Sequence, residues 1–168
     1  MTIVDKAYTF ATAAHAAVGQ KRKYDGEDYI VHPIRVANIV KQHGGTDSMI
    51  AAAYLHDVVE DTNVTMDTIT GMFGSVVASL VDDLTDVSCS YDGNRATRKS
   101  IDAQHTADAS ADAQFIKCAD IIDNSWDIRD KDPSFWKVYQ REMSLLLDEM
   151  VRVKGTDIYN EARASVEP

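Results

Sequence analysis

The stretch AAAYLHDVVED, residues 51–61, decides the fold, because a run of small and apolar residues passes directly into a cluster of ionisable side chains. Glu60 and Asp61 stand four residues beyond His56 and Asp57, so each pair shares one face of a predicted helix over residues 48–60. Three carboxylates and an imidazole are costly to bury unless a cation neutralises them. The stretch therefore predicts a packed helix that carries a functional site.

Composition restricts the class of protein and the class of partner. The 168 residues, 45% of them hydrophobic, suit one folded domain over residues 1–168 and argue against disorder. A formal net charge of −10 argues against a nucleic-acid polymer or an anionic membrane as the main partner. A small phosphorylated substrate stays compatible with that charge, provided that a metal and local cations reverse the field at its site.

Targeting signals and cysteine pairs are missing from the sequence. No apolar run approaches the roughly 20 residues of a membrane span, and the N-terminus lacks the pattern of a signal peptide. Cys89 and Cys118 form neither a metal-spaced pair nor a disulfide framework. We therefore expect a cytoplasmic protein in which Cys118 is a small core residue.

Apolar residues recur at helical spacing along the chain and predict an all-α, single-domain bundle of about eight helices. Thr65, Ser110 and Asp132-Pro133 are typical of helix starts, and Gly44-Gly45 and Gly155 of helix ends. A helix over 110–128 is expected to have Trp126 on its core side and a polar stripe formed by Lys117, Asp120 and Asn124. The other predicted helices span residues 3–18, 33–43, 65–72, 76–84, 133–155 and 157–165, with one more opening at Arg95.

Four side chains form a candidate metal site: His32, His56, Asp57 and Asp120. Such a mixed nitrogen and oxygen set suits manganese, iron or zinc better than a metal that demands thiolates. Four protein ligands leave positions for water and substrate, which is typical of catalytic rather than structural sites. Glu60 and Asp61, one turn away, are candidates for acid–base or water-orienting groups.

Two cationic groups interrupt the acidic sequence. The first lies in a loop over residues 20–29, where Asp25-Gly26 is a turn signal, and the second opens the helix at Arg95. The loop is interpreted either as solvated surface or as a phosphate-binding group, and the residues alone leave both readings open. No partner is identified for His15, His43 or His105. His15, just before the loop, is interpreted as an ordinary core or surface histidine, with support of the loop as the alternative.

The order of His32, then His56-Asp57, then a distant Asp120 resembles the HD-domain metal phosphohydrolase superfamily. Three segments narrow the resemblance to the hydrolase domain of the RelA/SpoT family, in particular its stand-alone small alarmone hydrolases of the metazoan SpoT homologue type. These segments are HAAVGQKRKYDGEDYIVHPIRVANIV (15–40), AAAYLHDVVEDTNVTMDTITGMFGSVVASLVDDLTD (51–86) and IKCADIIDN (116–124). The similarity covers roughly residues 5–128.

The resemblance implies a role for each candidate residue. His32, His56, Asp57 and Asp120 would bind one manganese ion, for which other first-row divalent metals exchange readily, and Glu60 and Asp61 would serve the attacking water and the leaving group. The remaining residues would contact the substrate. Arg22, Lys23 and Tyr29 match positions beside the base and ribose, Lys117 and Asn124 match the nucleotide site, and Arg95, Arg98 and Lys99 match loosely near the phosphates.

The reaction that the resemblance implies is hydrolysis of the 3′-pyrophosphate ester of the alarmone (p)ppGpp, which gives GDP or GTP and pyrophosphate. Two alternatives stay open: the same site acting on another nucleotide, such as the 2′-phosphate of NADPH or a nucleoside monophosphate, and a non-catalytic nucleotide-binding module. No segment resembles the synthetase or regulatory parts of the long bifunctional enzymes, so alarmone synthesis is not expected. The oligomeric state is left open.

Overall fold

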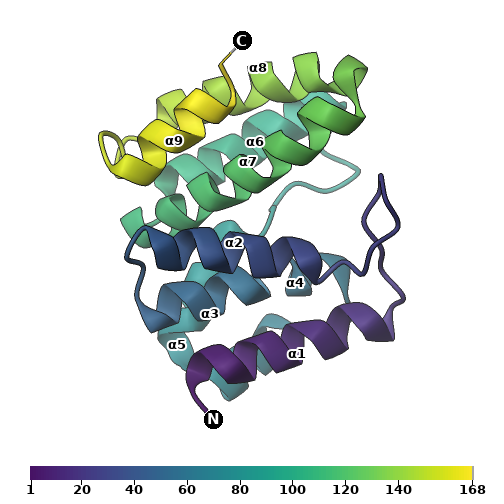
Figure 1. Ribbon diagram of the computed structural model, residues 1–168, viewed down its shortest axis with the longest axis vertical. Coiled ribbons are helices and arrows are strands. Elements are labelled where there is room, and N and C mark those ends of the chain that lie inside the picture. The colour runs from purple at the N-terminus through teal and green to yellow at the C-terminus, as the bar shows by residue number, and fades with distance from the viewer. Residues whose placement is uncertain (168) are drawn as a thin grey trace. The chain divides into compact units, whose positions relative to one another are not determined.

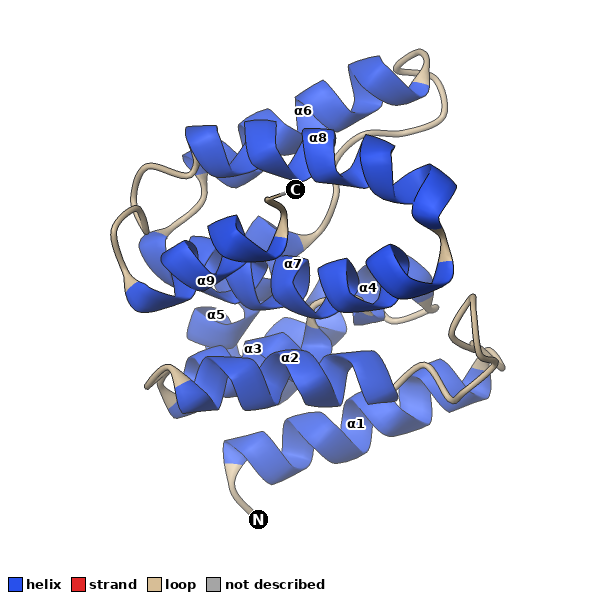
Figure 2. Cartoon of the chain, turned by 45° about the horizontal axis from the view of Figure 1, so that its top comes forward, coloured by secondary structure: helices blue, strands red, loops and turns tan. Residues whose placement is uncertain are grey.

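Helices joined by loops make up the computed structural model, which describes residues 1–167 (Figures 1 and 2). The expected all-α fold is confirmed, and one antiparallel bridge between Lys21 and Asp28 is the only strand-like pairing in that range. The described residues form nine helices, against the eight or so expected. They are α1 (Ile3–Ala17), α2 (Val31–Gln42), α3 (Asp47–Leu55), α4 (Val58–Asp61), α5 (Met66–Leu84), α6 (Arg95–Asp108), α7 (Ala111–Lys131), α8 (Pro133–Glu149) and α9 (Asp157–Ser165).

The chain divides into two compact units, one of α1–α5 over Met1–Thr85 and one of α6–α9 from Asp86 onward. The expectation of a single domain over residues 1–168 stays a prediction. Within residues 1–167, no helix combines the length and the apolarity that crossing a membrane requires.

Helix α3 is the centre of the first unit. Ala51, Ala52, Ala53 and Leu55 are completely buried, and α3 packs against α1, α2 and α5. Alanine side chains let the neighbouring helices approach closely, so the apolar run of the decisive stretch is confirmed as core. The side chains that follow are therefore attached to the end of a buried, well-packed helix.

The helix predicted over residues 48–60 is interrupted at His56 and Asp57. α3 ends at Leu55 and α4 begins at Val58, and Asp57 has φ −98° and ψ −3°, at the edge of the right-handed helical region. Nδ1 of His56 lies 2.7 Å from the carbonyl oxygen of Ala53, which in a continuous helix would accept a hydrogen bond from the backbone N–H of Asp57. The imidazole thus competes with the backbone for this carbonyl, and the helix breaks where the ionisable residues begin.

A kink divides α5 as the sequence predicts. Gly74 has φ +82° and ψ 169°, a conformation outside the helical region that glycine adopts without the steric cost of a Cβ. Thr65 caps the helix by accepting from the backbone N–H of Thr68. The predicted short helix to Met72 and the second apolar stripe from Val76 are therefore the two arms of α5.

Helix α7 is the centre of the second unit and packs against α8 and α9. Ser110 and Asp132 cap α7 and α8 as expected, by accepting from the backbone N–H groups of Ala113 and Phe135. Helix α8 ends at Glu149 instead of 155, because Met150 leaves the helical region with ψ 64°. The final helix matches its prediction.

Trp126 was expected in the core of α7 and is instead 76% exposed. It shares its face with Arg129 and Asp130, three and four residues on, which are also exposed. Ile122, Ser125 and Ile128 are buried, so the buried face of α7 does not include Trp126. A serine thus takes the buried position that the pattern assigned to the tryptophan.

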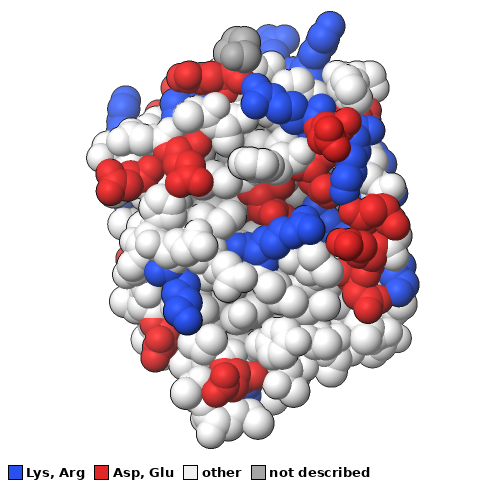
Figure 3. Space-filling view, viewed as in Figure 1, with Lys and Arg blue, Asp and Glu red and all other residues white. Residues whose placement is uncertain are grey.

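Acidic and basic side chains are interspersed on the face drawn in Figure 3. Several carboxylates of the second unit are paired with cations. Asp127 lies 2.7 Å from Lys131, Asp148 lies 2.6 Å from Arg163, and Asp86 lies 3.1 Å from Lys99. These pairs locally offset the acidic net charge.

The two cysteines should differ sharply in reactivity. Cys89 is exposed, whereas Cys118 is completely buried and burial raises the pKa of its thiol to about 12. Titration with a thiol reagent should therefore modify one cysteine in the native protein and both after unfolding, and the Cys89→Ser variant should react only when unfolded. Rapid modification of Cys118 in the native protein would contradict the packing of α7.

Candidate metal centre

Three predicted metal ligands lie together in the first unit. His32 comes from the first turn of α2, and His56 and Asp57 come from the break between α3 and α4. One potential ligand atom from each lies within 4.8 Å of the other two. Oδ2 of Asp57 is 3.0 Å from Nε2 of His56 and 3.7 Å from Nε2 of His32, and both imidazoles are buried. The two rings and the carboxylate thus converge on one point.

The hydrogen bonding of His56 indicates that this point suits a cation. A carbonyl oxygen can only accept, so the 2.7 Å contact with Ala53 assigns a proton to Nδ1 of His56. Without a second proton, Nε2 then directs a lone pair at a carboxylate oxygen 3.0 Å away, and the two repel unless a proton or a metal ion lies between them. Metal-binding histidines typically donate the other ring N–H to a carbonyl in this way. The donor set therefore fits a divalent metal ion.

Tyr29 reaches the same carboxylate. Its hydroxyl donates to Oδ2 of Asp57 at 2.6 Å, and its ring lies 6.0 Å from that of His32. The resemblance implied that Tyr29 lies beside the base and ribose of a substrate. Its hydrogen bond makes it a support for Asp57, and the substrate role stays a prediction.

Glu60 and Asp61 occupy α4, and both are exposed. Only Asp57 is largely enclosed, with 19% of its side chain exposed. Asp61 nevertheless has a defined partner, because Nε2 of Gln20 donates to its Oδ2 at 2.9 Å. Loss of hydration raises the pKa of Asp61, the Gln20 hydrogen bond opposes this, and the charge of Asp57 raises it further.

Gln20 is a site residue that the sequence reasoning missed. The available signal was its place in the family-like segment 15–40, directly before the basic residues. Its partner Asp61 is 41 positions away, so no local pattern joins the two.

Asp120 lies in the second unit, on α7, and is buried. Lys117 donates to its Oδ2 at 2.8 Å and Asn124 to its Oδ1 at 2.7 Å, so the predicted polar stripe is a connected network. Burial alone would lower the pKa of the Lys117 ammonium, but the charges of Asp120 and Asp86 outweigh it and raise the pKa above its ordinary value. Lys117 and Asn124, expected beside the nucleotide, thus hold a predicted metal ligand.

The first cationic group lies on a tight loop. The backbone N–H of Arg22 donates to the carbonyl of Glu27 at 2.8 Å, and Gly26 turns the chain with φ +73°. The guanidinium of Arg22 lies 5.8 Å from the ring centre of Tyr29, and the ammonium of Lys23 lies 4.9 Å from that of Tyr24. Arg22 therefore points back towards the residue that supports Asp57.

The second cationic group is mostly paired. Arg95 makes two hydrogen bonds to Glu142, at 3.0 and 2.8 Å, and Lys99 lies 3.1 Å from Asp86. Arg98, in contrast, makes no side-chain hydrogen bond or ion pair within residues 1–167, and its Nε is buried. Of these three cations, Arg98 is thus the one with a guanidinium available to an anion.

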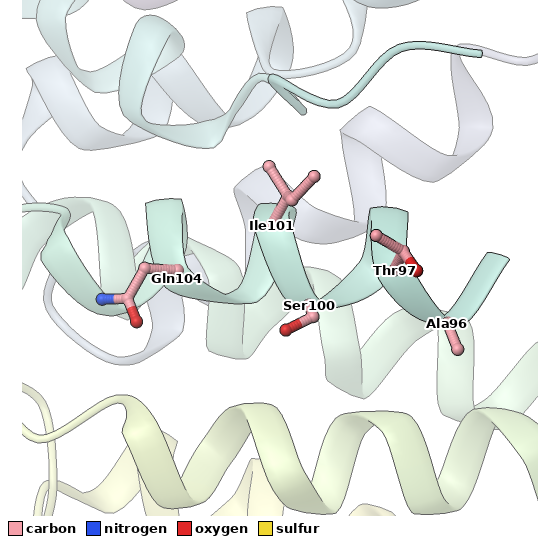
Figure 4. A pocket seen from close by; sticks show the side chains of 5 residues that line it. All are labelled: Ala96, Thr97, Ser100, Ile101 and Gln104. Carbon is pink, nitrogen blue, oxygen red and sulfur yellow. The ribbon is translucent and has the colours of Figure 1, made fainter. Parts of the chain in front are cut away.

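A shallow hollow lies on the surface of α6 (Figure 4). None of the side chains that line it is ionisable, and none is a predicted site residue. They are Ala96, Thr97, Ser100, Ile101 and Gln104. The hollow therefore offers no acid, base or metal ligand for chemistry.

Comparison with known proteins places these features in a family. The model of the HD domain family matches residues 7–119, which include every predicted site residue except Asp120 and Asn124. A solved structure of a metazoan ortholog of SpoT, which hydrolyses ppGpp, aligns with a TM-score of 0.79 and 26% identity over 99% of this chain and 94% of its own.

Curated relatives extend the comparison. The guanosine-3′,5′-bis(diphosphate) 3′-pyrophosphohydrolase MESH1 of Xenopus tropicalis is 36% identical over 138 residues, 80% of this chain and 74% of the relative. Human MESH1 is 33% identical, with 80% and 74% of the two chains covered. A probable 3′-pyrophosphohydrolase of Synechocystis is 44% identical over 86 residues, but the chain spans only 11% of that longer protein.

Removing the Tyr29 hydroxyl should weaken the metal centre without unfolding the unit. Tyr29→Phe keeps the ring but loses the donor to Asp57, and losing such an outer hydrogen bond typically costs about tenfold or more in metal affinity or activity. Calorimetric titration with Mn²⁺ should show this loss, whereas Tyr8→Phe, on the exposed part of α1, should bind as the unchanged protein does. Equal affinity in both variants would refute the supporting role.

Proposed function

Because the chain belongs to the HD-domain family, we propose that it is a metal-dependent hydrolase of guanosine 3′,5′-bis(diphosphate) and its pentaphosphate form, (p)ppGpp. It would cleave the 3′-pyrophosphate ester and release GDP or GTP and pyrophosphate. The convergence of His32, His56 and Asp57 carries this proposal, since it supplies a metal site of the kind that phosphate-ester hydrolysis uses. The MESH1 proteins of Xenopus tropicalis and human, of which the chain covers 74%, are named for this reaction and support the choice of substrate.

The proposed metal is a single manganese ion held by His32, His56 and Asp57, with Asp120 as the fourth ligand predicted from the sequence. A divalent ion there would lower the pKa of a bound water and polarise the attacked phosphate. Nitrogen and oxygen ligands of this type suit manganese, although they also accept iron, cobalt and zinc. The mixed donor set supports a catalytic rather than a structural metal.

Glu60 and Asp61 are proposed to serve the attacking water and the leaving group. The Gln20 hydrogen bond to Asp61 gives that carboxylate a defined direction, and its raised pKa makes it a better proton acceptor than an ordinary exposed aspartate. The proposed catalytic role of Glu60 rests on its position in the family motif, one residue before Asp61.

Substrate contacts are proposed for Arg22, Lys23, Tyr29, Lys117, Asn124, Arg98 and Lys99, as the resemblance implies. The contacts in the structure favour some of these over others. Arg98 has no carboxylate partner among the described residues, whereas Lys99 and Lys117 are each engaged by acidic side chains. We therefore assign phosphate binding chiefly to Arg98 and to the loop with Arg22 and Lys23.

The proposed partner is thus a small nucleotide, with no nucleic-acid polymer or membrane surface as the main partner, in keeping with the net charge of −10. We also propose a cytoplasmic location, which the two free cysteines support because reduced thiols persist in that compartment.

Incubation with ppGpp and Mn²⁺ should release pyrophosphate and GDP in equal amounts, measured by nucleotide chromatography and a pyrophosphate assay. Chelation should abolish the reaction. Asp57→Ala and Asp120→Asn should each lower kcat/KM by about a hundredfold or more, because metal stabilisation of the transition state contributes several kcal/mol. Asp47→Asn, at the exposed start of α3, is the matched control. Intact ppGpp with metal-replete protein, or release of phosphate from NADPH instead, would overturn the proposed substrate.

Arg98→Ala and Lys99→Ala should separate binding from stability. Loss of the Arg98 guanidinium should raise the KM for ppGpp about tenfold or more, since hydrogen bonds between charged groups are the strong ones, and should leave the melting temperature nearly unchanged. Lys99→Ala should lower the melting temperature, because Asp86 and the buried Asp102 lose a cation, and should alter KM less. The reverse pattern would contradict this division.

A further inference from the structure

His15 is a buried ionisable residue that the proposed chemistry does not use. It lies in the last turn of α1, is 2% exposed, and packs its ring 4.8 Å from that of Tyr29. Its Nδ1 is 2.7 Å from Oε1 of Gln20. The sequence identified no partner for this histidine, so the contact with Gln20 gives it one.

The amide of Gln20 joins His15 to Asp61. Its Nε2 donates to Oδ2 of Asp61 at 2.9 Å, and its Oε1 faces His15. An ionised carboxylate has no proton to donate, so the nitrogen end of the amide must face Asp61 and the oxygen end must face the imidazole. The charge of Asp61 therefore determines the orientation of the Gln20 amide.

That orientation in turn assigns the proton of His15. An amide oxygen can only accept, so Nδ1 of His15 must carry the hydrogen of the 2.7 Å bond. Nε2 is buried and has no hydrogen-bond partner within residues 1–167. The opposite tautomer would bury an unsatisfied N–H at Nε2 and oppose two lone pairs at Nδ1, which is the costlier arrangement. Burial also lowers the pKa of His15, which favours the neutral ring.

The same loop supports both carboxylates of the site. Gln20 and Tyr29 lie at the two ends of the basic loop, where the backbone N–H of Tyr29 donates to the carbonyl of Gln20 at 3.3 Å. The side chain of Gln20 holds Asp61, and that of Tyr29 holds Asp57. The ring of His15 packs on Tyr29 and its Nδ1 bonds Gln20, so one buried imidazole contacts both supports.

We propose that His15 and Gln20 are positioning residues for Asp61: the neutral Nδ1–H form of His15 orients the Gln20 amide, and the amide holds the carboxylate in one direction. The proposal rests on the proposed function in assigning Asp61 to the reacting water. Neither residue touches the substrate. Their contribution is to keep Asp61 ionised and aligned before the substrate binds.

The decisive variants separate hydrogen bonding from packing. His15→Asn places an amide N–H near the position of Nδ1 but leaves a cavity, whereas His15→Phe fills the space and has no donor. Gln20→Met keeps the length of the side chain and removes both hydrogen bonds. His43→Phe, at the end of α2, is the control for replacing a histidine outside the network.

We expect His15→Phe and Gln20→Met to lower kcat about tenfold or more, with KM for ppGpp and the Mn²⁺ affinity within about twofold of the unchanged protein. His15→Asn should retain kcat within about threefold although its melting temperature falls more than that of His15→Phe. A merely structural histidine would make activity follow stability. Equal kcat in His15→Phe and His15→Asn, or an unaltered kcat in Gln20→Met, would overturn the proposal.

A second measurement needs no substrate and no metal. The ¹⁵N shifts of the imidazole nitrogens distinguish the two neutral tautomers, and the metal-free protein at neutral pH should show His15 with its proton on Nδ1. Gln20→Met should lose this preference. A proton on Nε2 of His15 in the unchanged protein would overturn the proposal that His15 orients the Gln20 amide. Failure to hydrolyse ppGpp would overturn the proposed function alone, since the tautomer is then still measured directly.

Discussion

The contact between Oδ2 of Asp57 and Nε2 of His56, 3.0 Å apart in a largely buried place, is the constraint on which the first unit depends. The other ring nitrogen of His56 is committed to the carbonyl of Ala53, so the only way to relieve the repulsion is a proton or a cation between ring and carboxylate. The same hydrogen bond ends α3 and turns Asp57 towards His32. The imidazole of His56 thus interrupts the helix, and the interruption orients two predicted metal ligands, His56 and Asp57.

Donors orient three of the four predicted acidic site residues. Tyr29 holds Asp57, Gln20 holds Asp61, and Lys117 with Asn124 holds Asp120. These donors are hydroxyl and amide groups in the first unit, where a positive charge would compete with a metal ion. The proposed metal ion would further neutralise Asp57, and an acidic protein could then bind an anionic substrate at that place.

Several helix starts and the division of α5 follow from local chemistry that the sequence shows. Thr65, Ser110 and Asp132 cap their helices as expected, and Gly74 divides α5. The break at His56 could not be predicted from periodicity, because it arises from a side chain that takes a backbone carbonyl. The exposure of Trp126 depends on how α7 is rotated in its unit, which hydrophobic spacing leaves ambiguous. Gln20 escaped notice because its partner Asp61 is distant in sequence.

The proposed manganese ion between His32, His56 and Asp57 can be examined most directly by pulsed electron paramagnetic resonance of the protein loaded with one equivalent of Mn²⁺. Electron spin echo envelope modulation detects ¹⁴N nuclei bound to the metal. Two imidazole nitrogens should couple to the ion, and one coupling should disappear in each of His32→Ala and His56→Ala. A spectrum without nitrogen modulation, or one that neither substitution changes, would show that the ion binds elsewhere and would contradict the assignment of the centre.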